Sequence, residues 1–380
     1  MSDVLSHRAI ADRLARGRAK TLAFVADLDD AALCAWPSED FSPLGWHLGH
    51  VGFTEAHWIL ERCAGRGELS APFSRAWAQG GCPKRERTQQ PPKAELLAYL
   101  ARVRDAVLEV LPTLALDGDD PLVRGGFVGW FVEAHEHQHR ETMAIVRQLA
   151  LEAQRPPPPP PSLRGAPVFA AVAGGTLTMG TDAPLAYDNE RPAHEVRVAP
   201  FALSEPITAG AWDTFRAAGG YETRALWTDE GWAWREALGV THPRGWTRDT
   251  DGALARVTLD GRLRHVAPSD PVAGVSCHEA EALARFFDAR LPTEAEWERA
   301  AAHGEPREPA WVWTSTTFGP YDGFAPFPYR GYSEPYFDGR HRVLKGGSSA
   351  TDPSVARRTF RNFYLPETRA IFAGVRLARG

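Results

Sequence analysis

The chain has 380 residues, a formal net charge of −5, and 43% hydrophobic and 24% charged residues. This length exceeds what one ordinary hydrophobic core supports, so two domains are expected. The small negative charge excludes an electrostatic basis for binding nucleic acid or an anionic membrane, and neither is expected as a partner.

Cysteine usage and hydropathy indicate a reducing compartment. Cys34, Cys63, Cys82 and Cys277 are too widely spaced to form a C-x-x-C pair, which argues against a zinc ribbon or a redox dithiol. The N-terminal stretch lacks the apolar core of a signal peptide, and no apolar run approaches the ~18 residues of a membrane span. A cytoplasmic location is therefore expected. The sequence carries no signal for the oligomeric state.

Residues 1–153 are expected to form a helical domain. Apolar residues recur at helical spacing in four segments, at residues 7–28, 42–63, 93–111 and 119–154. Ser42 is the expected cap of the second helix, with Pro43 just inside it, and Asp120 and Pro121 open the fourth. Four amphipathic helices predict a four-helix bundle. The long loop between the second and third helices, roughly residues 65–92, is expected to be functional or mobile.

The rest of the chain has a different texture. Six consecutive prolines at 156–161 fix φ and offer no amide donors, so residues 154–164 are expected to be a semi-rigid linker. Residues 165–380 combine short strand-like pieces, many Gly and Pro residues, and one clear helix at 277–290. The expected fold class is thus an α domain followed by an α+β domain.

The stretch HEHQH lies on the fourth predicted helix and carries three histidines. His135 and His139 are four residues apart and share one helix face, whereas His137 points about 200° away from His135. A second group, His47 and His50 in WHLGH, lies on another predicted helix. Because metal sites in bundles form between facing helices, a metal site is expected here. Periodicity favours His50 over His47 only weakly.

The same stretch also fits H-E-x-x-H, the zinc-protease signature. That interpretation needs Glu136 as a base and a further ligand downstream, but Thr142 stands where the longer motif has Gly, and the proline run follows. Three neutral imidazoles would instead leave three octahedral positions open. This donor set suits ferrous iron, zinc or copper. Open neighbouring positions for a substrate and dioxygen favour nonheme Fe(II).

The second domain resembles a known family through several blocks, among them AGGTLTMGTD, LPTEAEWERAA, VLKGGSSATDPSVARRTFRN and FAGVRLAR. They look like successive parts of the formylglycine-generating-enzyme/sulfatase-modifying fold, a C-type-lectin-like module, over nearly all of residues 168–380. The stretch after GGS lacks the cysteine pair that binds copper in the true formylglycine-generating enzymes. Formylglycine chemistry is therefore not expected.

The first domain resembles the DinB-like four-helix bundle. WHLGHVGFTE and HEHQHRET are similar to the two metal-binding blocks of the ergothioneine sulfoxide synthases, and this resemblance covers about the whole chain. It implies that His50, His135 and His139 hold Fe(II) and that His47 is structural. It also implies a reaction in which dioxygen is used to join sulfur to carbon 2 of the imidazole of hercynine, which is trimethyl-histidine. His137 and His57 are expected on the polar surface or behind the ligands.

The resemblance also implies substrate-binding residues. Gln138 would hydrogen-bond the substrate imidazole, Asn362 would bind the substrate, and Phe363 would wall its pocket unless it is ordinary core. Ten aromatics between residues 311 and 337 suit the trimethylammonium group. Trp313 in that run, and Tyr364 beside Phe363, are further candidates for substrate contact.

A basic stretch of the long loop contains Arg85 and Arg87, which would bind the carboxylates of a thiol donor such as γ-glutamylcysteine. A solvated basic loop is the alternative interpretation.

The chain departs from the common ergothioneine synthases at the segment TFGPYDGF. The family has a tyrosine that supplies a proton to reduced dioxygen where this chain has Phe318; Tyr321 keeps the second tyrosine position. The loop RAWAQGGCPKRERTQQPP has no tyrosine to replace it. A chain without either proton-donating tyrosine is more similar to the selenoneine synthases. The expected catalytic positions are Phe318 and Tyr321.

The expected reaction is then carbon–selenium bond formation on hercynine with a selenosugar donor. The first alternative is carbon–sulfur bond formation with cysteine or γ-glutamylcysteine. An alternative of another class is a non-catalytic lectin-like binding protein.

Overall fold

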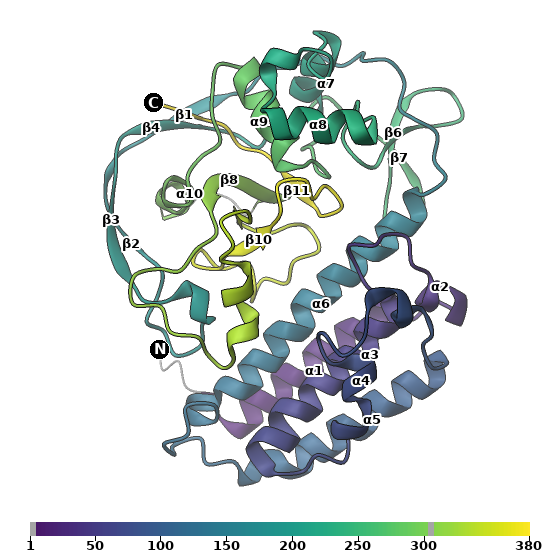
Figure 1. Cartoon of the computed structure of the whole chain (residues 1–380), viewed down its shortest axis with the longest axis vertical. Helices are drawn as coiled ribbons and strands as arrows, with labels where there is room; N and C mark the ends of the chain where they lie inside the picture. Colours follow the sequence, from purple (N-terminus) through teal and green to yellow (C-terminus); the bar gives the residue numbers. More distant parts are fainter. Residues whose placement is uncertain (1–4, 303–307) are drawn as a thin grey trace. The chain divides into compact units, whose positions relative to one another are not determined.

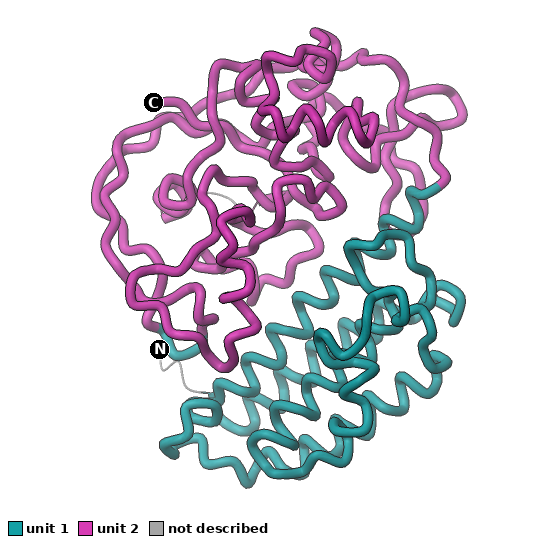
Figure 2. The backbone as a smooth tube through the Cα atoms, viewed as in Figure 1, with its two compact units in different colours: residues 1–153, 183–185 teal, residues 154–182, 186–380 magenta. Residues whose placement is uncertain are grey.

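The computed structural model describes residues 5–302 and 308–380. The chain divides into two compact units (Figure 2). Unit 1 comprises Met1–Ala153 with Ala183–Leu185, and unit 2 comprises Gln154–Asp182 with Ala186–Gly380. Unit 1 is helical and unit 2 mixes helices with short strands, which confirms the expected fold class (Figure 1). Within the described ranges, no helix combines the length and hydropathy that a membrane crossing demands.

Unit 1 is built on four long helices that correspond to the four predicted segments. The α-helices of this unit are α1 His7–Phe24, α2 Asp30–Cys34, α3 Leu44–Glu55, α4 Ser74–Trp77, α5 Lys93–Val110 and α6 Phe127–Glu152. Helix α3 continues into a π-helical segment, and short 3-10 turns cap or connect the others. These pieces are η1 Ala56–Arg62, η2 Ala71–Phe73, η3 Lys84–Thr88, η4 Leu111–Thr113 and η5 Arg124–Gly126.

Two predicted helix starts were wrong, each for a local reason. The N-cap of α3 is Pro43, without a side-chain cap, because the Ser42 hydroxyl instead accepts a hydrogen bond from Arg87 Nη1 at 2.9 Å. The fourth helix begins at Phe127 rather than near Pro121. Gly125 and Gly126 adopt the left-handed conformation, at φ 64° and 81°. This conformation interrupts the helical backbone, so α6 begins only after Gly126.

Helix α3 is buried along its entire length. Its glycines let neighbouring rings come close: a Cβ added at Gly49 would lie 2.2 Å from the Trp77 ring, and one at Gly52 would lie 2.8 Å from the Tyr99 ring. Trp77 belongs to the long loop that was expected to be functional or mobile. The loop contains η2, α4 and η3, and Trp77 seats it on α3 with only 4% of its surface exposed.

One buried ion network joins all four long helices of unit 1. Arg18 of α1 donates from Nε to Glu136 Oε1 of α6 at 2.9 Å and from Nη2 to Glu55 Oε2 of α3 at 2.7 Å. Arg104 of α5 donates from Nε to Glu55 Oε1 at 2.6 Å. Burial alone would raise the pKa of Glu136, but the charge and hydrogen bonds of Arg18 outweigh it and lower that pKa.

The described residues of unit 2 form four small sheets. The strand orders are β1-β4-β12, β10-β9-β8-β11, β2-β3 and β5-β6-β7. The strands are β1 Phe169–Val172, β2 Gly175–Met179, β3 His194–Val198, β4 Phe201–Ser204, β5 Trp246–Arg248, β6 Leu254–Val257, β7 Leu263–His265, β8 Trp311–Thr317, β9 Arg342–Lys345, β10 Asn362–Tyr364, β11 Ala373–Gly374 and β12 Ala378–Arg379. One core cluster of this unit contains Leu177, Met179, Val198, Phe201, Leu203, Ala300 and Ala378.

Four α-helices and four 3-10 turns complete the part of unit 2 that the structure describes. They are α7 Ala209–Ala217, α8 Asp229–Leu238, α9 Cys277–Phe286, α10 Glu294–Ala301, η6 Asp188–Glu190, η7 Arg224–Leu226, η8 Arg330–Tyr332 and η9 Glu334–Tyr336. The predicted helix at 277–290 is α9, which starts at a capping box between Ser276 and Glu279 and ends four residues earlier than predicted.

The proline-rich segment belongs to unit 2 rather than forming a separate linker. The amides of Ser162 and Leu163 donate to Asp213 Oδ2 at 2.7 and 2.9 Å, and Thr247 Oγ1 donates to the carbonyl of Pro156 at 2.7 Å. Proline removes amide donors but keeps carbonyl acceptors, so this run can still be fixed by donors from outside it.

Replacing Arg18 with Met should strongly destabilise unit 1, because Glu55 and Glu136 would lose a buried cation. We expect the free energy of unfolding to fall by about 3–5 kcal/mol, measured by urea denaturation with helix circular dichroism. Arg8→Met is the matched control, since Arg8 forms only an exposed pair with Asp12; it should leave the midpoint unchanged. Equal midpoints for the two variants would contradict the role given to the network.

Candidate metal centre

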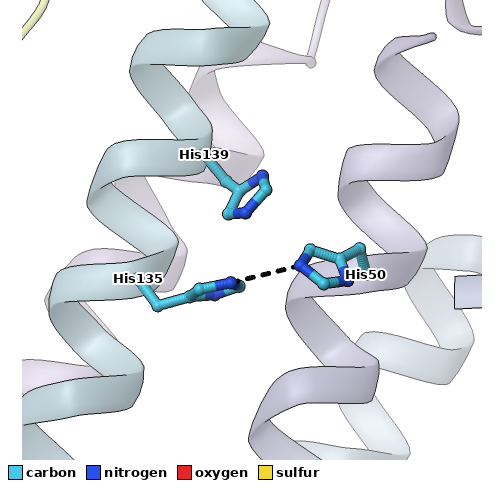
Figure 3. A group of neighbouring side chains, drawn as sticks. All are labelled: His50, His135 and His139. Carbon is cyan, nitrogen blue, oxygen red and sulfur yellow. Dashed lines mark hydrogen bonds between the residues drawn. The ribbon is translucent and has the colours of Figure 1, made fainter. Parts of the chain in front are cut away.

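Three imidazoles from two helices of unit 1 converge on one point. His50 comes from α3, and His135 and His139 come from α6 (Figure 3). One ring nitrogen from each residue lies within 4.8 Å of the other two. The Nε2 atoms of His50 and His135 are 3.1 Å apart, and the ring centres of His135 and His139 are 4.3 Å apart. The spacing of four residues on α6 therefore stacks two histidines opposite a third, as predicted.

The orientation of His50 is fixed from behind by the long loop. Its Nδ1 lies 2.6 Å from the carbonyl oxygen of Trp77. A carbonyl only accepts, so Nδ1 carries the proton and Nε2 presents its lone pair toward His135. The ring of Trp46 stacks on His50 with centres 4.5 Å apart, and the Arg87 guanidinium lies 4.1 Å from the centre of the Trp46 ring.

The three imidazoles are neutral at ordinary pH. Burial, together with the nearby charge of Arg87, lowers the pKa of His50 to about 4. Burial also holds the pKa values of His135 and His139 well below their ordinary value. Neutral imidazole is the form that ligates metals, and this donor set of three nitrogens with no carboxylate fits a borderline divalent cation such as Fe(II).

His47 lies beside this cluster but outside it. Its Nδ1 is 2.9 Å from Nδ1 of His139, so it contacts one member of the cluster from behind. Burial lowers the pKa of His47 to about 3. The sequence left the choice between His47 and His50 nearly open, and the geometry brings His50 into the cluster.

The remaining histidines of the motif regions lie elsewhere. His137 is 3% exposed, and its Nε2 is 3.6 Å from Glu133 Oε1. A surface position for it was therefore wrong, although it does turn away from the cluster. His57 is partly exposed and bonds through Nδ1 to Glu61 Oε2 at 3.0 Å. Glu136, the base that a zinc protease would need, is paired with Arg18.

The predicted substrate residues of unit 1 have contacts of their own. Gln138 precedes His139 on α6 and donates from Nε2 to the carbonyl of Ala134 at 3.3 Å. Arg87 is buried and donates to the carbonyl of Cys82 from Nε and Nη2, at 3.2 and 3.0 Å. These contacts give Arg87 a role in shaping the loop, whereas Arg85 is exposed. Substrate binding by Gln138 and Arg85 stays a prediction.

Phe318 lies in an aromatic stack of unit 2. It is 1% exposed, its ring centre is 4.1 Å from that of Phe363 at an angle of 13°, and Phe337 is 5.0 Å away. Phe363 also contacts Tyr336, with ring centres 4.8 Å apart. Phe318 therefore packs against other aromatic rings of its own unit.

Tyr321 has a hydroxyl that is already engaged. It donates to Glu294 Oε1 at 3.1 Å, and Arg361 Nε donates to the same carboxylate oxygen at 2.8 Å. Burial raises the pKa of Tyr321, and the charge of Glu294 raises it further. The phenol therefore holds its proton tightly within this network.

The last predicted contacts lie on two neighbouring strands. Trp313 of β8 has no exposed surface and donates from Nε1 to the carbonyl of Val275 at 2.9 Å. The structure thus makes Trp313 a core residue, with no surface left for the substrate contact that was predicted. Asn362 and Tyr364 lie on β10 and are partly exposed, and Asn362 Oδ1 accepts from the amide of Phe363 at 3.0 Å.

Sequence reasoning missed two supports of the cluster, the Trp77 carbonyl and the Arg18 network. A backbone acceptor leaves no signature in side-chain identity. The network left a weak signal, since of its members Glu55 is a charged residue in a largely apolar helix stretch, whereas Arg18 and Glu136 lie among other polar residues. Charge inside a helix that must be buried predicts a partner, but not which one.

Comparisons with known proteins cover both units. Residues 13–143 match the DinB superfamily, and residues 157–315 and 309–380 match the Sulfatase-modifying factor enzyme 1-like domain, so the predicted bundle and lectin-like module are confirmed. The chain is 34% identical to formylglycine-generating enzyme of Streptomyces coelicolor over 148 residues, 34% of this chain and 46% of that protein.

Two relatives extend over almost the entire chain. One is hercynine oxygenase of Mycobacterium tuberculosis, 36% identical over 437 residues, covering 98% of this chain and 99% of that protein. The other is hercynine oxygenase of Mycolicibacterium smegmatis, 34% identical over 444 residues, covering 99% of each chain. Proteins that are this similar over almost their whole length belong to one family. The chain therefore belongs to the hercynine oxygenase family.

Proposed function

We propose that the protein is an Fe(II)- and dioxygen-dependent enzyme that joins the sulfur of cysteine or γ-glutamylcysteine to carbon 2 of the hercynine imidazole. The observation that carries this proposal is the convergence of His50, His135 and His139 in a chain that resembles hercynine oxygenases from end to end. The relatives favour this carbon–sulfur reaction over the carbon–selenium reaction that Phe318 had suggested. The same chemistry implies small-molecule substrates.

The protein's own residues would prepare the site in three ways. The neutral imidazoles of His50, His135 and His139 would hold Fe(II) on one face, and the bound ion would supply open positions for dioxygen and the sulfur donor. The Trp77 carbonyl fixes the proton of His50 on Nδ1. Gln138, next to His139, would turn its amide toward the substrate imidazole on binding.

A second candidate, selenium transfer from a selenosugar, is favoured by one observation. Phe318 has no proton to give, and the hydroxyl of Tyr321 is hydrogen-bonded to Glu294. Selenium is a better nucleophile than sulfur and is more easily oxidised, so a selenium donor would place less demand on a tyrosine proton. The donor therefore has to be identified by experiment.

Removing a ligand should remove the metal. We expect His50→Ala, His135→Ala and His139→Ala to lose bound iron after anaerobic reconstitution with Fe(II), measured by elemental analysis and followed by loss of hercynine-dependent dioxygen consumption. His137→Ala is the control, since His137 faces away on the same helix, and should keep its iron. Retention of iron in all four variants would overturn the assigned ligands.

Moving Trp77 should weaken the metal site without touching a ligand. Gly49→Ala places a methyl group where the Trp77 ring lies, so the loop must shift and release His50 Nδ1. We expect metal affinity to fall about 10–100-fold, the usual effect of losing such a support. Gly67→Ala is the control, because a Cβ there meets its nearest neighbour at 3.6 Å. A lower melting temperature with unchanged affinity would argue against this role of Trp77.

The donor can be identified by supplying the candidate donors one at a time. Cysteine, γ-glutamylcysteine and a selenosugar are each added in turn to the protein with hercynine, Fe(II) and air, and the products are weighed by mass spectrometry. We expect a sulfur conjugate of hercynine from cysteine or γ-glutamylcysteine. A product from the selenosugar alone would establish the second candidate, and hercynine binding without dioxygen consumption would indicate a binding protein.

Phe318→Tyr tests whether this ring sets the choice of donor. If it does, the variant should shift the ratio of sulfur to selenium product. Phe337→Tyr is the matched control, because Phe337 belongs to the same aromatic stack. An unchanged ratio in Phe318→Tyr would restrict Phe318 to packing.

A further inference from the structure

A second cluster of metal-binding side chains lies in unit 2, on residues that the sequence analysis did not single out. Glu230 is on α8, His278 is on α9, and Glu367 follows β10. One ligand atom from each, a carboxylate oxygen or a ring nitrogen, lies within 4.8 Å of the other two. Three segments distant in the sequence thus present donor atoms to one another.

The cluster contains buried polar atoms without partners. His278 is 5% exposed, and its Nε2 is buried with no hydrogen-bond partner in the described part of the chain. The same is true of Glu367 Oε2, whereas Oε1 of that carboxylate accepts from Arg340 Nη2 at 3.2 Å. Buried polar atoms left unpaired are destabilising, and a bound ion would satisfy them.

The electrostatics favour a cation at this cluster. Burial lowers the pKa of His278. The carboxylates of Glu230, Glu281, Glu367 and Glu279 all act on His278 and oppose that shift, which places the ring in a negative field. Arg340 beside Glu367, Arg285 beside Glu281 and Arg369 beside Glu279 neutralise part of this charge.

We infer that Glu230, His278 and Glu367 bind a divalent transition-metal ion of the zinc class. Zinc binds imidazole nitrogen and carboxylate oxygen at about 2.0–2.2 Å, so donor atoms that lie within 4.8 Å of one another can enclose it once the cluster contracts around the ion. The imidazole selects zinc over calcium and magnesium, which prefer oxygen ligands alone. Three protein ligands leave a fourth position for water.

Such an ion would fasten the segment that follows β10. The carbonyl of Pro366 already accepts from the amide of Cys277 at 2.9 Å, so this segment lies against the start of α9. A metal bound by Glu367 would add a second attachment, to both α8 and α9. This inference goes beyond the proposed function and does not depend on the histidine cluster of unit 1.

The full-length protein can report on this site alone if the other cluster is disabled. In a His139→Ala background, stripped with a chelator, we expect equilibrium dialysis to give about one bound equivalent of Zn²⁺ and a higher melting temperature with zinc than without. His139→Ala/His278→Gln should lose both effects, and His139→Ala/Glu367→Gln should bind at least about tenfold more weakly. His139→Ala/His265→Gln is the control, because His265 is exposed and paired with Asp249.

The outcomes separate the possibilities. Equal melting temperatures of the parent and His278→Gln proteins without metal would show that the variant is folded and that any loss of zinc is local. Zinc binding unchanged by His278→Gln, or no zinc bound by the His139→Ala protein, would overturn the inference. Ca²⁺ binding that matches Zn²⁺ and ignores His278→Gln would also overturn it, since an acidic surface alone would then suffice.

Discussion

The buried ion network around Arg18 is the interaction on which the arrangement of unit 1 depends. Two carboxylates and two guanidinium groups are withdrawn from water between four helices, and each would be costly if left alone. Their mutual geometry therefore restricts how the helices slide or rotate relative to one another. Glu136 directly follows His135 on α6, and Glu55 lies five residues after His50 on α3. The restriction is thus applied next to the clustered histidines.

This proximity explains how polar chemistry is maintained inside a helical bundle. A centre made of three neutral imidazoles has no charge of its own to organise its surroundings before a cation binds. The neighbouring network supplies that organisation with paired charges, while the Trp77 carbonyl and the Trp46 ring fix His50 from two further directions. The centre is preorganised by groups that do not need the metal to be in place.

Much of the fold could be predicted because it follows from local rules. Helical periodicity located the four long helices, and a spacing of four residues placed His135 and His139 on one face. The failures have physical causes of another kind. Ser42 could not cap α3 because Arg87, distant in sequence, bonds its hydroxyl. The proline run could not be placed because its partners, Asp213 and Thr247, lie in a different part of the chain.

The candidate site also has features that follow from local sequence and features that depend on tertiary packing. The spacing of His135 and His139 predicted that they share a helix face, whereas the surroundings of Phe318 and Trp313 depend on tertiary packing that no spacing reveals. Phe318 has an aromatic neighbour on Phe363 and Trp313 has a backbone acceptor on Val275, and both arrangements use residues far away in the sequence. Resemblance to a family assigns roles to positions, but the environment of each position decides whether a side chain faces a ligand or the interior.

The attachment of the long loop through Trp77 has a consequence for how such a protein can diversify. Trp77 is fixed on Gly49 and holds His50, whereas much of the chain from Ala78 to Gln89 lies outside these contacts and is largely exposed. Insertions or substitutions in that exposed part leave the anchor intact. The exposed part of the loop can therefore change in sequence and length while the position of His50 is kept, so that variation and constancy are assigned to separate parts of one loop.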